Sequence, residues 1–529
     1  MNPSDATPRD LQGLLDAAHL HFRASRWEEA RRLLREAVEI APEHGEALEG
    51  LAYLALREGD AAHAADYFDR AIEHLPPSPQ RQHDAGMTNQ AAGRHERALA
   101  CFERALAMAP DALPTLKTAA LCASELGRFD EAARALERVR ELEPRAWQSH
   151  YNLGRALGLA GRYEEEIACY RRAIELQPTG AAAYVNLGVA LRDLHRFDEA
   201  LRVFKKAVQL ESDHAGARTN RAQTNLLLGQ FEHGWREYEW RWRDGGQQHP
   251  FGPNAWHGEA SLAGKTLLVF NEQGFGDTLQ FVRYVDKLAA TTGARVILRV
   301  QDALRPLLAG YPGTSAVIGE SDTVPPFDRH CPLMSLPFAL AAHREPIPAP
   351  TPYLHADAAR RTAWRERLGQ ARAGLRVGLA WSGSTTHLND RNRSMPLASW
   401  RPIVDACGAG ATIVSLVKEV REPDRDTLRT LPVLDVSDGL GTFADTAALV
   451  AELDLVICVD TAVAHLAGAL GTPVWILLPY TPDWRWQLDR ADSPWYSCAR
   501  LFRQPARGDW APVIEAVRDA VQHEAGRRG

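Results

Sequence analysis

The chain has 529 residues, 45% of them apolar and 24% charged, and its net charge is −7. These values are those of an ordinary globular protein, so they exclude a wholly disordered or fibrous chain, and the length predicts about three or four domains. The acidic balance argues against a broad nucleic-acid-binding surface. No apolar run reaches the roughly 18 residues of a membrane span, and the polar start of the chain lacks the apolar core of a secretion signal.

The seven cysteines are scattered along the chain and form no C-x-x-C pair. This arrangement argues against a disulfide framework and against a zinc site built from paired thiolates. It indicates a reducing compartment, so we expect the protein in the cytoplasm.

The first half of the chain repeats itself every 34 residues. The period is marked by prolines and by glycines, with His195 in one glycine place: Pro42, Pro76, Pro110, Pro144 and Pro178; Gly59, Gly93, Gly127, Gly161 and Gly229. Each unit is expected to hold two short helices, with the glycine in the turn between them and the proline after the second. Because no unit buries its apolar face alone, the units stack into a curved α solenoid. The pattern resembles the tetratricopeptide repeat over residues 10–244.

A row of asparagines recurs at the same period, on the first helix of the unit, which is expected to line the concave side: Asn152, Asn186 and Asn220. Side-chain amides in a row can bind an extended peptide through its backbone, which predicts a protein acceptor or partner. Alternatively these asparagines are solvated or bond their own helix. A similar ladder occurs in the repeats of the O-linked N-acetylglucosamine protein transferases, a resemblance that favours peptide binding.

The repeats end in an aromatic and arginine-rich stretch at 231–244. Such a stretch could bind nucleic acid, but terminal repeats are atypical, so we expect it to cap the solenoid and pack on the next domain. Residues 245–264 are rich in glycine and proline and are predicted to be a linker.

From residue 265 the pattern changes to apolar strands that alternate with helical runs. The predicted strands are 265–270, 294–300, 375–381, 411–416, 453–460 and 472–479. This βαβ rhythm predicts parallel sheets covered by helices. We expect two Rossmann-like lobes, 265–372 and 373–529, that bind ligands beyond the carboxyl ends of their strands.

The first motif is a loop after the first of these strands, with Gly274, Gly276 and Asp277. It matches neither the phosphate loop nor the dinucleotide fingerprint, so ATP hydrolysis and nicotinamide binding lack their usual signatures. The glycines allow a substrate to approach closely, and Asp277 at the start of a helix can face it. Alternatively Asp277 only caps that helix.

The second motif joins a strand to a helix at Asp460, Thr461 and Ala462, with His465 one turn later. The free N–H groups and positive dipole end of this helix predict an anion site suited to a diphosphate. His465 could reach that site, or it could be a packed histidine.

The third motif is Ser382 and Gly383 after a strand, followed by Arg393. A small-residue loop with arginines predicts a phosphate clamp, to which Lys418 would add a further cation. Alternatively the arginines are ordinary surface charges.

Together the three motifs resemble the heptosyltransferase family of glycosyltransferases, which has the two-lobed GT-B fold, over residues 265–520. The resemblance implies that Asp277 is the catalytic base and that Asp460, Thr461, Ala462 and His465 bind the donor's phosphates and sugar. It also implies that Arg393 neutralises the leaving diphosphate. Alanine replaces the usual glycine at 462, and arginine replaces the usual lysine at 393. Repeats followed by such a domain look like bacterial protein glycosyltransferases, including those that modify flagellins.

These observations predict transfer of a sugar from a nucleotide-sugar donor to a hydroxyl of a protein, flagellin-like or other, held by the solenoid. Asp277 would accept the hydroxyl proton, and Arg393, Lys418 and the amides near Thr461 would stabilise the leaving charge. The resemblance implies an inverting reaction without a metal, and we expect no cofactor besides the nucleotide sugar. The alternatives are an inactive scaffold that still binds nucleotide, and a transferase acting on a lipid-linked sugar or lipopolysaccharide.

Overall fold

The computed structural model describes residues 10–243, 249–341, 347, 351–369, 374–386 and 389–527. The chain divides into two compact units, Met1–Leu194 and His195–Gly529. Each unit is described by itself.

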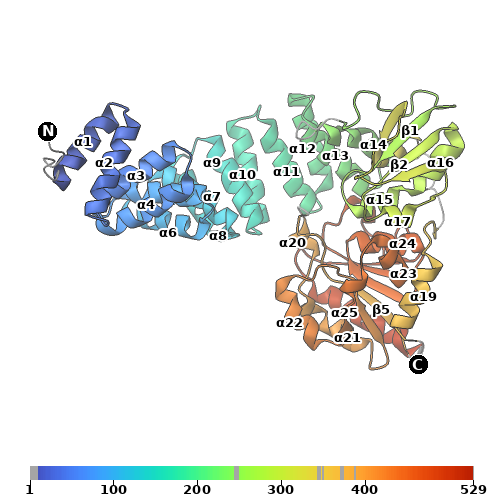
Figure 1. The fold of residues 1–529 in the computed structure, drawn as a ribbon. Coiled ribbons are helices and arrows are strands. Elements are labelled where there is room, and N and C mark those ends of the chain that lie inside the picture. The colour runs from blue at the N-terminus through green and yellow to red at the C-terminus, as the bar shows by residue number, and fades with distance from the viewer. Residues whose placement is uncertain are drawn as a thin grey trace, which may run out of the picture. The chain divides into compact units, whose positions relative to one another are not determined.

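The first unit is a succession of antiparallel helix pairs, shown in blue to teal in Figure 1. Its helices are α1 (Leu11–Arg23), α2 (Trp27–Ile40), α3 (Gly45–Arg57), α4 (Ala61–His74), α5 (Pro79–Ala91), α6 (His95–Met108), α7 (Leu113–Glu125), α8 (Phe129–Leu142), α9 (Trp147–Leu159), α10 (Tyr163–Leu176) and α11 (Ala181–Asp193). Each helix packs on the next, so the 34-residue helical repeat that the sequence predicts is confirmed.

The repeat signature has two physical causes in this unit. The turn glycines adopt the left-handed backbone conformation that side chains disfavour, with φ of +80° at Gly59 and +73° at Gly93. The small residues let helices approach: a Cβ at Gly86 would lie 2.5 Å from the buried ring of Phe102. Turn geometry and close packing therefore both impose the period.

The second unit begins with three more helices, α12 (Phe197–Leu210), α13 (Ala215–Leu227) and α14 (Phe231–Tyr238), followed by the 3-10 helix η1 (Glu239–Trp242). His195 takes the glycine place with φ of +58°. Its ring stacks on Tyr480 at 3.9 Å, and its Nε2 donates to the Tyr480 carbonyl at 3.0 Å. These contacts attach the helices to the α/β part of the same unit.

Within the stretch 231–244, the described residues 231–243 pack on the α/β part, as expected. The ring of Trp235 meets Trp484 edge-on at 5.2 Å and Phe281 at 5.8 Å. Arg241 is buried and donates to both carboxylate oxygens of Glu272, each at 2.7 Å. An aromatic cluster and a buried ion pair therefore join these repeat helices to the first sheet.

The first sheet has four parallel strands in the order β3-β2-β1-β4. They are β1 (Thr266–Phe270), β2 (Arg295–Arg299), β3 (Thr314–Ile318) and β4 (Arg329–Pro332). The helical segments of this lobe are α15 (Phe275–Phe281), α16 (Arg283–Thr292), α17 (Arg305–Leu308), η3 (Leu333–Ser335) and α18 (Leu336–Ala339).

Part of the predicted linker lies along the edge of this sheet. Trp256 N donates to the carbonyl of His330 in β4 at 2.8 Å, and His330 N donates to the carbonyl of Asn254 at 3.2 Å. The indole of Trp256 is buried. Residues 244–248 lie outside the described residues, and the domain limits drawn from the sequence stay a prediction.

The second sheet has six parallel strands in the order β10-β9-β8-β5-β6-β7. They are β5 (Arg376–Ala380), β6 (Thr412–Ser415), β7 (Val433–Leu434), β8 (Leu455–Val459), β9 (Val474–Leu478) and β10 (Ala499–Arg503). Its helical segments are α19 (Ala358–Arg367), α20 (Asp390–Arg393), η5 (Leu397–Trp400), α21 (Arg401–Ala406), α22 (Glu422–Thr430), η6 (Ser437–Gly439), α23 (Phe443–Val450), α24 (Ala462–Leu470), η7 (Trp484–Trp486) and α25 (Ala511–Gly526).

Both sheets have the strand order of the Rossmann fold, with the order reversing between β1 and β4 and between β5 and β8. The expected architecture, a helical solenoid followed by two Rossmann-like lobes, is therefore confirmed. One buried core runs through both sheets and α13–α14. Among the described residues, no helix has the length and apolarity needed to cross a bilayer.

Candidate functional site

The strand order places two of the predicted motifs side by side. β5 and β8 are neighbours, and both are fully buried, so the residues after them meet at one edge of the sheet. Thr461 is the N-cap of α24, and its Oγ1 accepts the N–H of Val463 at 3.1 Å. Ser382 and Gly383 follow β5. This reversal point is where sheets of this kind bind ligands.

Arg393 connects the two strand ends. Its Nη1 donates to the carbonyl of Asp460 at 2.7 Å. Its Nη2 lies against Gly383, where a Cβ would be only 2.7 Å away. Its Nε is buried, makes no hydrogen bond and lies 3.9 Å from Asp390 Oδ1. The arginine is therefore held inside the site and is not exposed on the surface.

The sequence interpretation missed Arg421 and Asp390, which hold the loop after β5. Arg421 Nη2 donates to the carbonyl of Gly383 at 2.9 Å and to Asp390 Oδ2 at 2.6 Å. Ser394 donates to Asp390 Oδ1 at 2.6 Å and accepts the N–H of Gly383 at 3.0 Å. Lys418 is exposed and has a different partner, the carbonyl of Gly441 at 3.2 Å.

Asp277 lies in the first turn of α15, after β1. Its Oδ2 accepts the N–H of Gly274 at 2.8 Å, which is the capping contact considered as the alternative role. Its Oδ1 also pairs with Arg485 of the second lobe, and the side chain is 16% exposed. The carboxylate therefore caps its helix and faces the other lobe.

Arg485 follows β9 and carries a buried charge between the lobes. Besides Asp277 it donates to Gln280 Oε1 and to Asp483 Oδ1, each at 2.7 Å. The two aspartates raise the pKa of the guanidinium against the effect of burial. Sequence reasoning missed this residue. The signal was its position after β9, on the same sheet edge as Asp460.

His465 is packed, as one of its two predicted roles had it. Its Nδ1 lies 2.9 Å from the hydroxyl of Tyr496, and its ring stacks on Trp486 at 5.2 Å. Burial, and next the nearby charge of Arg485, hold its pKa well below the usual value, so the imidazole is neutral. A Cβ at Gly276 would lie 2.7 Å from its Cδ2, so only glycine fits there.

The carboxyl group of Asp460 belongs to the same charge cluster. Burial, and next the charge of Asp483, raise its pKa to about 6, while Arg393 and Arg485 act in the opposite direction. Arg485 thus pairs with Asp277, and its charge acts on both Asp460 and His465. In the described part of this unit, no three metal-ligating side chains converge within 4.8 Å.

The three asparagines have different surroundings. Asn152 on α9 is exposed. Asn186 Nδ2 donates to the hydroxyl of Tyr151 at 3.0 Å. Asn220, in the second unit, donates to the carbonyl of Gly216 in its own helix at 2.9 Å, which is the alternative considered from the sequence. Peptide binding by this row stays a prediction.

Comparisons with known proteins agree with this geometry. Tetratricopeptide repeat families match residues 15–79, 80–112, 118–181 and 181–214. Glycosyltransferase family 9 (heptosyltransferase) matches residues 440–506, a segment that contains Asp460, His465 and Arg485.

The protein FlbA of Caulobacter vibrioides is 27% identical over 329 residues, which are 57% of this chain and 54% of FlbA. The chain thus spans about half the length of this relative. Among solved structures, MamA of Desulfovibrio magneticus is 20% identical, with a TM-score of 0.30. The match covers 32% of this chain and 96% of the MamA chain. YrrB, described as a TPR protein with an unusual peptide-binding site, is 22% identical, with 35% and 95% covered and a TM-score of 0.31. The chain is thus similar to tetratricopeptide repeat families within residues 15–214 and to glycosyltransferase family 9 (heptosyltransferase) over residues 440–506.

Proposed function

We propose that this protein transfers a sugar from a nucleotide-sugar donor to a hydroxyl group of a protein bound by the repeats. The observation that supports this most is the contact of Asp277 and Arg485, because it joins a carboxylate of the first lobe to a buried arginine of the second lobe. A base and an anion site facing each other are what sugar transfer to a hydroxyl requires.

The donor diphosphate would lie at the start of α24. Peptide N–H groups and the positive end of the helix dipole favour an anion there. Arg393 adds a positive charge at the same strand end, where its Nη1 bonds the carbonyl of Asp460. As the bond from the anomeric carbon to the diphosphate breaks, these groups stabilise the charge that develops on the leaving oxygen.

Asp277 would be the base. Its Oδ2 accepts the N–H of Gly274 at 2.8 Å and its Oδ1 pairs with Arg485, and the side chain is 16% exposed at the edge where the two lobes meet. As the hydroxyl oxygen bonds to the anomeric carbon, its proton passes to Asp277. Arg485 holds the carboxylate in place. We further propose that the reaction inverts the anomeric carbon and needs no metal.

The solenoid would supply the protein acceptor. Exposed Asn152 offers an amide donor and acceptor for an extended backbone. Asn220 contributes less in this proposal, because its amide N–H₂ already bonds Gly216 in its own helix.

Two variants of the purified protein test the proposal with UDP, GDP, ADP and CMP and their sugars. Asp277→Asn should lower donor turnover by about 10²–10⁴-fold, the usual contribution of a general base, while nucleotide binding persists. Arg393→Ala should weaken binding of the nucleoside diphosphate that raises the melting temperature. Arg391→Ala is the matched control, since Arg391 lies on the same short helix but is exposed. Unchanged turnover in Asp277→Asn would show that Asp277 is not the base. If a nucleotide binds to the wild type but no sugar donor is turned over, the result would favour an inactive scaffold that binds nucleotide.

A further inference from the structure

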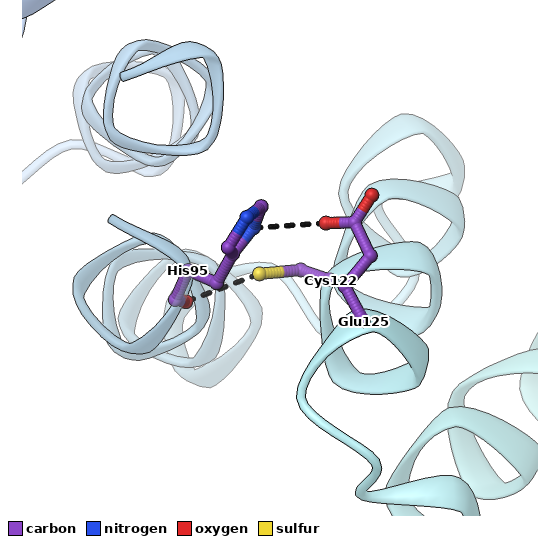
Figure 2. A group of neighbouring side chains, drawn as sticks. All are labelled: His95, Cys122 and Glu125. Carbon is purple, nitrogen blue, oxygen red and sulfur yellow. Dashed lines mark hydrogen bonds and ion pairs between the residues drawn. The ribbon is translucent and has the colours of Figure 1, made fainter. Parts of the chain in front are cut away.

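A second cluster of reactive side chains lies in the solenoid, away from the residues discussed so far. His95 is the first residue of α6, and Cys122 and Glu125 lie in the last turn of α7. Figure 2 shows the three side chains directed toward one another from the two helices. One ligand atom from each lies within 4.8 Å of the others.

The repeat itself does not require these residues. One repeat later, the same three positions hold Phe129, Ala156 and Leu159. One repeat earlier they hold Ala61, Thr88 and Ala91. The scaffold is therefore satisfied by apolar or small neutral residues at each position, and the histidine, thiol and carboxylate coincide in addition to what packing needs.

The contacts within the cluster leave ligand atoms available. His95 Nδ1 lies 2.9 Å from Glu125 Oε2, yet this buried nitrogen makes no hydrogen bond. Two polar atoms that are close but misaligned for a hydrogen bond can both be used by an ion seated beside them. Cys122 Sγ is fully buried and donates to the carbonyl of His95 at 3.1 Å, so the sulfur points toward the same place.

The mixture of nitrogen, sulfur and oxygen ligands determines which ion fits. Calcium and magnesium prefer oxygen ligands alone, whereas zinc accepts imidazole, thiolate and carboxylate together in a tetrahedral site. One thiolate and one carboxylate also neutralise a charge of +2. His95 and Glu125 are about one-third exposed, which gives an ion a path from solvent.

We propose that His95, Cys122 and Glu125 bind one zinc ion, with a water molecule as the fourth ligand. When the ion binds, the S–H bond of Cys122 breaks, a zinc–sulfur bond forms and the proton passes to solvent, so no electron is transferred. The argument from the sequence against a zinc site concerned paired cysteines, and this site uses a single thiolate. The ion ties α6 to α7 and so links two successive repeats.

Cobalt(II) is the probe, because it substitutes for zinc and gives a sulfur-to-cobalt charge-transfer band in the near ultraviolet. We expect the full-length, metal-free protein to bind one Co²⁺ with this band, and an equimolar amount of Zn²⁺ to abolish it. Cys122→Ala should remove the band and the zinc-dependent rise in melting temperature. Alanine is the residue of the next repeat at this position, so the variant is expected to fold.

Two further variants complete the test. Cys101→Ala is the matched control and should keep the band, because Cys101 is also a buried thiol but lies on α6, outside the cluster. His95→Phe introduces the aromatic residue of the next repeat and should weaken Co²⁺ binding while circular dichroism stays that of the wild type. Absence of the band in the wild type, or its survival in Cys122→Ala, would overturn the proposal and leave an ordinary His95–Glu125 ion pair beside a buried thiol.

Discussion

The surroundings of Asp460 raise the pKa of its carboxyl group. Its pKa of about 6 lies above the usual value of 3.8, because burial and Asp483 outweigh Arg393 and Arg485. The folded protein therefore binds the Asp460 proton more tightly than the unfolded chain does. The stability contribution is complete below the unfolded pKa near 4 and is lost as the pH rises toward 6.

Asp460→Asn should remove this dependence. Relative to wild type, the variant should gain free energy of unfolding as the pH rises from about 4 to 6, with a slope of at most ~1.4 kcal/mol per pH unit, and stay level above it. Urea unfolding of both proteins across this range measures the difference. A wild-type-minus-variant difference that is flat with pH would show that Asp460 ionises as freely as an exposed aspartate.

Residue positions were predictable where the rule about strand ends applied. It identified Asp277 and Asp460, and the arginines after β5 pointed to Arg393, which bonds the Asp460 carbonyl. Asp277 pairs with Arg485, whose charge also acts on Asp460. Arg485 escaped because its partner Asp277 is 208 positions away, and no local pattern encodes a contact of that range. Lys418 also follows a strand, but its long side chain reaches Gly441 instead.

At the scale of elements, the two lobes meet where α15 contacts α24. Gly276 of α15 lies flat on the ring of His465, and that ring is itself held between Trp486 and Tyr496. A side chain at 276 would therefore clash with this packed ring.

Gly276→Ala should lower the free energy of unfolding by about 1–3 kcal/mol, the usual cost of overpacking. Gly274→Ala is the matched control two residues earlier, where a Cβ meets only Asp277 at 3.4 Å and φ is −87°. It should change stability by less than about 0.5 kcal/mol. Equal thermal unfolding of the two variants would contradict the tight contact.

The strands that the sequence predicted are the central ones of both sheets. The strands it missed, β3, β4, β7 and β10, are the four edges. Central strands are covered on both faces and so are long apolar runs, such as Leu455–Val459. Edge strands need fewer apolar residues: β3 is half-buried along its length, and β4 reads Arg-His-Cys-Pro. β3 is thus hidden by its partial burial, and β4 by its short, mixed composition, although three of its four residues are buried.

At the scale of the molecule, Arg241 links the last repeat helices to the first sheet within the second unit. It pairs with Glu272, whose side chain is 6% exposed. Removing one partner of such a pair leaves a buried charge without compensation, at a cost of about 3–5 kcal/mol. Arg241→Met should therefore lower the calorimetric transition of the second unit and leave that of the first unit in place.

The control for this measurement is Arg128→Met in the first unit. Arg128 pairs with Glu96 at the surface, where both side chains are more than 40% exposed, so the loss should stay within about 1 kcal/mol. A single transition that shifts equally in both variants would mean that the two units unfold together.

The segment around residues 254–256, which lies along β4, has a role that its glycine- and proline-rich composition does not indicate. A free strand edge presents unpaired N–H and C=O groups that can recruit a strand of another molecule. Asn254 and Trp256 occupy those groups at His330, and the antiparallel bridge of Asp492 with Arg500 does the same beside β10. The segment predicted to be a linker thus also covers the strand edge and prevents it from pairing with a strand of another molecule. Shortening this segment would expose the edge of β4 and favour aggregation.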